Sequence, residues 1–150
     1  MASTLSLTKD TEMNIIFAIT FSLITLFSTN IYAQTPPSTD VEVYLISPLD
    51  GEIVTNPVTV KFGLRGMGVA PAGIDRANTG HHHLIIDRDL PALDQPIPMD
   101  GNHKHFGGGQ TEASIELSPG KHTLQLIMGD RTHIPHTPPV ISKKITILVK

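Results

Sequence analysis

The feature that most constrains the fold of this chain is a set of short segments in which apolar residues alternate with other residues. Proline and glycine separate these segments from one another. This alternation places every second side chain on one face of a β-strand. It recurs at Val43 and Leu45, at Val58, Val60 and Phe62, at Leu84 and Ile86, at Ile115 and Leu117, at Leu124, Leu126 and Met128, and at Ile145, Ile147 and Val149. Turn residues, as in Pro48 to Gly51 and Pro119-Gly120, lie between these segments. The pattern predicts about six strands.

Helices are not expected. No window carries the apolar stripe of an amphipathic helix, and prolines are spread through the connections, where they disfavour long helices. We therefore predict an all-β chain with a single small immunoglobulin-like β-sandwich over residues 42–150; a small β-barrel is the alternative. Two long connections, Gly66 to Gly80 and Arg88 to Gly109, are candidates for function, because long loops in compact domains often carry it.

The first 33 residues have the features of an export signal. Residues 15–27 are uncharged and mostly apolar, yet too short for the ~20 residues that span a bilayer. Ala33 precedes Gln34 at a small-residue cleavage site. Met13 is a candidate for the true start, and an uncleaved anchor is the alternative reading. We predict a signal peptide over residues 1–33, a flexible lead-in over 34–41, and a periplasmic or secreted protein with no stable membrane anchor after cleavage.

The composition limits the kinds of functional site that the chain can form. The chain has no cysteine, which excludes disulfides, thiolate nucleophiles and thiolate metal ligands. Its formal net charge is −3 at pH 7, and it has no run of Lys or Arg, so nucleic acid is not an expected partner. A metal ion is the first expected partner, and a periplasmic protein is a further candidate.

Histidine is the residue type that stands out, because all eight lie between His81 and His136. His81 and His83 are two residues apart, so on a strand they share one face, about 6.6 Å apart along its axis. If Leu84 and Ile86 point into the core, those two histidines point away from it, whereas His82 is expected to be a core residue. The pair His103 and His105 repeats the spacing, His133 and His136 form an HxxH group, and His122 opens a strand.

Imidazole groups favour zinc and copper, and also nickel and iron. Three neutral imidazoles with an open position would make a zinc site, whereas a nearby Met128 or Met99 would favour copper. We predict copper or zinc as the bound metal, with Glu112 or Asp130 available to orient an imidazole. The first-choice ligands are His81, His83, His105, His133 and His136, and the second choices are His103 and His122.

Two other functions remain open. Histidines can brace loops by hydrogen bonding to backbone groups, which would suit a non-catalytic immunoglobulin-like binding or structural module. A metal-dependent hydrolase is the third hypothesis, although no G-x-S-x-G motif is present and an enzyme is not favoured. The glycines at 107–109 lack the GK[ST] ending of a phosphate loop and instead allow tight turns or the close approach of another segment. For the metal-binding hypothesis, the expected role is sequestration, delivery or sensing.

Several segments together resemble a known family. They are Gly80 to Asp87, His105 to Glu112, Leu117 to Leu126, Gly129 to His133 and His136 to Val140. This combination resembles the small exported bacterial proteins catalogued as domain of unknown function 4399, over about Val43 to Val149. The resemblance implies export and this set of motifs but no activity. Residues 47–51 also resemble the first turn of many bacterial immunoglobulin-like domains, which is an analogy of fold alone.

Overall fold

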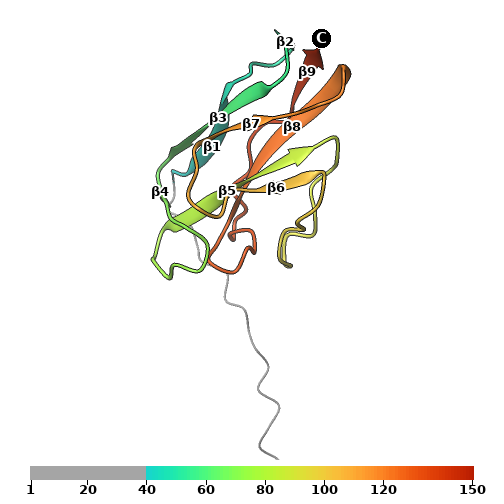
Figure 1. Ribbon diagram of the computed structural model, residues 1–150. Helices are drawn as coiled ribbons and strands as arrows, with labels where there is room; N and C mark the ends of the chain where they lie inside the picture. Colours follow the sequence, from blue (N-terminus) through green and yellow to red (C-terminus); the bar gives the residue numbers. More distant parts are fainter. Residues whose placement is uncertain (1–39) are drawn as a thin grey trace, which may run out of the picture. The chain divides into compact units, whose positions relative to one another are not determined.

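The computed structural model describes residues 40–150, and all the regular elements in this range are strands (Figure 1). They are β1 (Glu42–Ser47), β2 (Ile53–Val54), β3 (Val58–Arg65), β4 (Gly68–Val69), β5 (Thr79–Ile86), β6 (His103–His105), β7 (Glu112–Ile115), β8 (Gly120–Gly129) and β9 (Ile145–Val149). Within residues 40–150 we find no helix whose length and apolar character would let it cross a bilayer. The predicted signal peptide and nearly all of the predicted lead-in lie outside the described residues.

The strands form two sheets that do not close into a barrel. One sheet has the order β1-β3-β7, and the other has the order β2-β9-β8-β5-β4, with β6 also paired to β5. The prediction of a β-sandwich is therefore confirmed, and the barrel alternative is wrong. Each of the six apolar segments lies in or beside a strand, namely β1, β3, β5, β7, β8 or β9. The three strands that were not predicted, β2, β4 and β6, have only two or three residues each.

The main core lies between the two sheets and is built from the predicted alternation. Val60 of β3, Leu84 of β5 and Leu126 of β8 are completely buried there. Each such side chain contributes roughly 1.5–3 kcal/mol when it is withdrawn from water. This core fixes which face of β5 points inward, and so it also fixes the direction of the histidines on that strand.

A second apolar cluster covers the outer face of the larger sheet. Ile85 of β5 and Ile127 of β8 pack there with Ile97, which belongs to the connection between β5 and β6, and with Ile141. As a result β5 is buried on both faces, with every residue from Gly80 to Ile86 buried. Residues that point away from the main core on this strand are therefore enclosed by loops rather than exposed to solvent.

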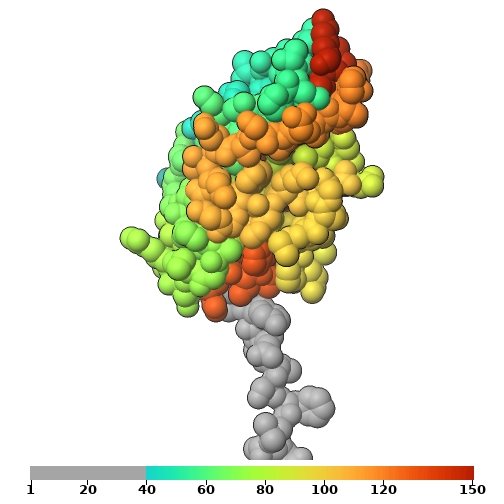
Figure 2. All heavy atoms as spheres, viewed as in Figure 1, coloured from blue at the N-terminus to red at the C-terminus, as the bar shows by residue number. Residues whose placement is uncertain are grey.

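Four connections come together over this outer face. The amide of Gly73, in the connection from β4 to β5, donates to the carbonyl of Arg131, 3.0 Å away, and the amide of Ile97 donates to the carbonyl of His133, 2.9 Å away. The amide of Ala72 donates to the carbonyl of Gly107, 2.8 Å away. In Figure 2 the green, yellow and orange surfaces of these segments adjoin one another. The loops therefore form a joined cover over the beginning of β5.

Candidate metal centre

Four histidines from three separate parts of the chain meet under this cover. His81 and His83 come from β5, His105 comes from β6, and His133 comes from the connection after β8. β6 lies beside β5 (Figure 1), and His105 lies directly opposite His83 in their antiparallel register, so the two side chains share one face. The six distances between their ring centroids range from 4.7 to 6.0 Å. We call these residues the four-histidine cluster.

The ring nitrogens of the cluster are close enough to share one ion. His81, His105 and His133 each offer a nitrogen, and these three atoms lie within 4.8 Å of one another, so the three residues could hold a metal ion. The Nε2 atoms of His81 and His83 are 3.0 Å apart. Two nitrogens bound to one tetrahedral zinc at 2.0–2.1 Å would be about 3.3 Å apart. The observed spacing fits either a shared ion or a hydrogen bond between two neutral imidazoles.

Burial keeps three of these imidazoles neutral. Burial, followed by the repulsion from His105 and His133, lowers the pKa of His81 to about 4, against an opposing effect of Asp130. Burial and then the neighbouring histidines lower the pKa of His83 to about 2, and the pKa of His105 is lowered by burial and by His133. At neutral pH these three rings therefore carry no proton that a metal ion would have to displace from an imidazolium.

Several nitrogens of the cluster have no protein partner. Among the described residues, the Nδ1 atoms of His81 and His83 and the Nε2 atom of His105 are buried and make no hydrogen bond. Buried polar atoms are nearly always hydrogen-bonded, and each exception calls for an explanation such as an ion or water. An ion bound by the cluster would take one nitrogen of each ring, and Nε2 of His105 is available for this.

Two glycines leave the space that the cluster occupies. A Cβ atom at Gly129 would lie 3.0 Å from Nε2 of His83, and one at Gly107 would lie 2.4 Å from Nε2 of His105. Gly129 pairs with His81 across β5 and β8, so its missing side chain would point toward the cluster. The sequence had suggested close approach at the glycines of 107–109, but nothing in its pattern marked Gly129.

Asp130 organises the turn that presents His133. Its Oδ1 atom accepts hydrogen bonds from the amide of Thr132 at 2.7 Å, the hydroxyl of Thr132 at 2.7 Å and the amide of Ile134 at 3.1 Å. His133 lies between these donors with a φ of 69°, in the left-handed region that non-glycine residues rarely adopt. The carboxylate thus holds the backbone on both sides of His133. Of the two carboxylates proposed to orient an imidazole, Glu112 lies exposed on β7.

His122 lies at the far end of the sheet and is braced. Its Nδ1 atom is 2.7 Å from Oδ2 of Asp87, and its Nε2 atom is 2.8 Å from the carbonyl oxygen of Ser118. Burial alone would lower the pKa of His122, but the bonds to Asp87 and Ser118 outweigh it and raise the pKa. The hydroxyl of Ser118 is 3.4 Å from Nε2. Because Nε2 donates its proton to the closer carbonyl, it cannot act as a base toward that hydroxyl.

The remaining histidines have other surroundings. His103 neighbours the cluster on β6, but its Nδ1 atom is 2.9 Å from Oδ1 of Asp100. His136 is buried with Nε2 only 2.7 Å from where a Cβ of Gly80 would lie. His82 is in the main core, with its ring centroid 5.1 Å from that of Phe62. The structure thus brings together four of the seven candidate ligands, whereas His103 lies against Asp100 and His122 lies at the far end of the sheet.

The two methionines considered for copper lie elsewhere. Met128 is completely buried in the main core, where it is paired with His82. Met99 is 69% exposed. The cluster is therefore composed of imidazoles, with no thioether supplied by Met128.

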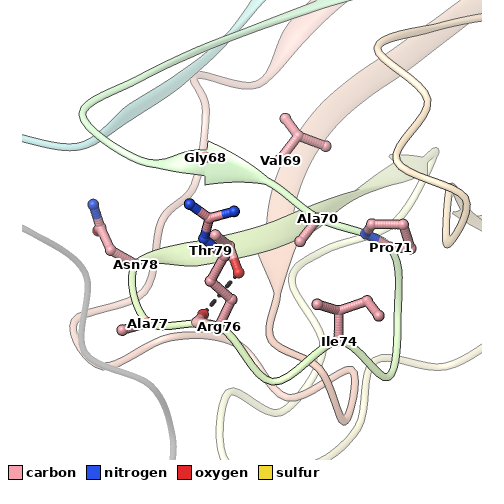
Figure 3. A pocket seen from close by; sticks show the side chains of 9 residues that line it. All are labelled: Gly68, Val69, Ala70, Pro71, Ile74, Arg76, Ala77, Asn78 and Thr79. Atoms are coloured by element: carbon pink, nitrogen blue, oxygen red, sulfur yellow. Dashed lines mark hydrogen bonds between the residues drawn. The ribbon is translucent and has the colours of Figure 1, made fainter.

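A separate pocket of about 520 Å³ lies along β4 and the connection that follows it (Figure 3). The hydroxyl of Thr79 donates to the carbonyl oxygen of Arg76 within it, 2.8 Å away. Its lining is Gly68, Val69, Ala70, Pro71, Ile74, Arg76, Ala77, Asn78 and Thr79. None of these residues is a histidine, so the pocket and the cluster are distinct features.

Comparison with known proteins places the whole histidine region in one family. No curated protein and no solved structure matches this chain. A family model described as a domain of unknown function, DUF4399, matches residues 60–150, which include every histidine and the strands that carry them. The chain belongs to the DUF4399 family.

Proposed function

We propose that this protein binds one transition-metal ion, copper or zinc, through the four-histidine cluster. The observation that carries the proposal is that His81, His105 and His133 bring ring nitrogens within 4.8 Å of one another from three separate segments. His83 adds a nitrogen 3.0 Å from that of His81. Imidazole nitrogens in this number are the ligands that zinc and copper accept.

The electrostatics of the cluster support the same function. Metal ligation needs the neutral imidazole, and the lowered pKa values of His81, His83 and His105 favour that form. The ion would also give a partner to Nε2 of His105, which is buried and makes no hydrogen bond within the described residues. Bracing, the competing explanation, instead describes His122, whose two nitrogens both have acceptors.

For the cell, we propose sequestration, delivery or sensing of the metal in the periplasm or outside the cell. This location is supported by the apolar segment 15–27 and the cleavage motif before Gln34. No catalytic step is needed for these roles.

The test is elemental analysis and titration calorimetry of protein purified without a histidine tag, since a tag would itself bind metal. We expect one zinc or copper ion per chain. The double variant His81→Ala/His105→Ala should lose binding, while His122→Gln should keep it, because His122 lies outside the cluster. If wild-type protein binds neither ion more tightly than about 0.1 mM, which is roughly −5.5 kcal/mol, the proposal is wrong.

A further inference from the structure

We infer that Asp130 is the anionic partner of the bound cation. It holds His133 in place without ligating the ion, and its charge makes the cluster favour divalent over monovalent metal ions. The inference rests on the proposed metal binding and adds a charge preference to it. It arises from a carboxylate whose surroundings are unusual for a buried charge.

Asp130 is buried without a cationic partner. Its exposed fraction is 1%, and among the ion pairs formed within residues 40–150 none includes it. The neighbouring Arg131 instead pairs with the exposed Asp75, 3.5 Å away. Removing a carboxylate from water is costly unless a positive charge or a full set of donors compensates for it. Three hydrogen bonds to Oδ1 compensate for part of this cost, and a metal ion held by the cluster would add a positive charge.

The geometry shows that Asp130 acts on the site from outside the ligand set. Its Oδ1 atom already accepts three hydrogen bonds, two of them from Thr132 and one from the amide of Ile134. These bonds bracket His133 and hold it in the left-handed region. In metal sites, such residues behind the ligands orient them and tune the affinity for the ion.

The charge of Asp130 also acts on the cluster itself. The amide of His133 donates to the carbonyl oxygen of Asp130 at 2.9 Å, so an ion bound by His133 lies near this residue. The four imidazoles are neutral ligands, so they compensate none of the charge of a bound ion. Coulomb energy is proportional to the charge of the ion, so the carboxylate stabilises a divalent ion about twice as strongly as a monovalent one at the same place.

Asp130→Asn tests this, because asparagine keeps an acceptor oxygen for the turn but removes the charge. Affinities for Zn²⁺ and for Ag⁺, a monovalent probe that imidazole binds, are measured by competition titration. We expect the Zn²⁺ affinity to fall about 10–100-fold and the Ag⁺ affinity about 3–10-fold. The second fold-change is the square root of the first, because the Coulomb energy lost for a monovalent ion is half of that lost for a divalent ion. Glu116→Gln removes one charge from an exposed side chain and should change neither affinity.

A second variant separates charge from positioning. Thr132→Val keeps the carboxylate but removes the hydroxyl that donates to it, so any loss should be equal for the two ions. If Asp130→Asn also lowers both affinities equally, or lowers neither, the inference is wrong. Failure of the wild-type protein to bind Zn²⁺ would instead overturn the proposed function.

Should Asp130→Asn not fold, nuclear magnetic resonance of the wild-type protein gives the answer. Zn²⁺ titration should shift the imidazole ¹⁵N resonances of the cluster, which reports on metal binding, together with the ¹³Cγ resonance of Asp130. The ¹³Cδ resonance of Glu116 should not move. Imidazole shifts with an unchanged Asp130 resonance would overturn the inference and leave metal binding intact.

Discussion

The two ends of β5 and β8 hold buried histidines in opposite surroundings. At the beginning of β5, His81 and His83 lie among other imidazoles, and their Nδ1 atoms make no hydrogen bond. Beyond the other end, His122 lies between the carboxylate of Asp87 and a backbone carbonyl. The pKa values are lowered in the first region and raised in the second. Burial alone therefore does not decide the role of a histidine; the available acceptors do.

This difference separates two uses of the same side chain in one sheet. Where acceptors surround both nitrogens, the ring is stabilised as an imidazolium and connects neighbouring segments. Where the neighbours are other imidazoles, protonation is disfavoured and lone pairs remain available to an ion. Each experiment that follows changes one of these two regions, and the other region serves as the comparison.

The largest expected effect is a loss of stability of the metal-free protein in acid. Because the folded pKa of His81 is about 4 and the ordinary value is 6.5, the unfolded chain binds a proton between these values that the folded chain does not. The stability that results is present above pH 6.5 and is lost as the pH falls toward 4. For His81 alone the loss is on the order of 3 kcal/mol. Urea unfolding at several pH values measures it.

The matched variant is His81→Gln, which should reduce the loss between pH 6.5 and pH 4 by the contribution of His81, while His82 and His83, with pKa values of about 4 and about 2, still contribute to it. His122 acts in the opposite direction, because its raised pKa gives stability below pH 6.5 that is lost as the pH rises through the folded value. A wild-type stability that stays constant from pH 7 to pH 4 would contradict the lowered pKa values.

The second prediction concerns metal-dependent stabilisation. Zinc or copper at a hundredfold excess over Kd should raise the stability by about 2.7 kcal/mol at pH 7.5 and by a similar amount at pH 5, because the pKa values of His81 and His83 in the folded protein lie below 5. His105→Ala should abolish this increase, because it removes one of the three nitrogens that lie within 4.8 Å. Thermal unfolding with and without metal measures it. In His122→Gln the increase should persist, and its loss there would show that the two regions are not separate.

Much of the fold could be predicted, because burial between two sheets imposes a period of two on each strand. Leu84 and Ile86 revealed the inward face of β5, and the direction of His81 and His83 followed from it. What this alternation could not show was the second apolar cluster, since Ile97 lies in a connection with no periodic pattern. The prediction that His81 and His83 point away from the main core holds, but they are buried by that cover.

Which histidines belong to the cluster was harder to predict, because the spacing of histidines in the sequence does not show which groups each imidazole contacts in the fold. The HxH of His103 and His105 looks symmetrical in the sequence, yet Asp100 hydrogen-bonds the first, while the second lies against His83. Likewise His136 follows His133 closely in the sequence but is buried beside Gly80. Only the folded positions of the acceptors distinguish ligand candidates from braced histidines.

The third prediction uses the space beside His83. Gly129→Ala would place a Cβ 3.0 Å from Nε2 of His83, so the ring must shift by a few tenths of an ångström. Overpacking of this kind costs about 1–3 kcal/mol, and we expect roughly a tenfold loss of metal affinity. Gly101→Ala is the control, because a Cβ there meets nothing within 4 Å. Equal affinities of the two variants, measured by calorimetry, would mean that His83 does not contribute to metal binding.

The smallest effect is expected at the braced end of the sheet. His122→Gln removes a charge-assisted bond to Asp87, whose side chain is 39% exposed, so we expect a loss of only about 1 kcal/mol in the free energy of unfolding. Because the pKa of His122 is raised in the folded state, the deficit should be larger at pH 6 than at pH 8.5, where the imidazolium is lost. Urea titrations at the two pH values measure it without metal. A deficit that grew with pH would mean that the ring is neutral between Asp87 and Ser118, and the contrast with the four-histidine cluster would then lie in hydrogen bonding alone.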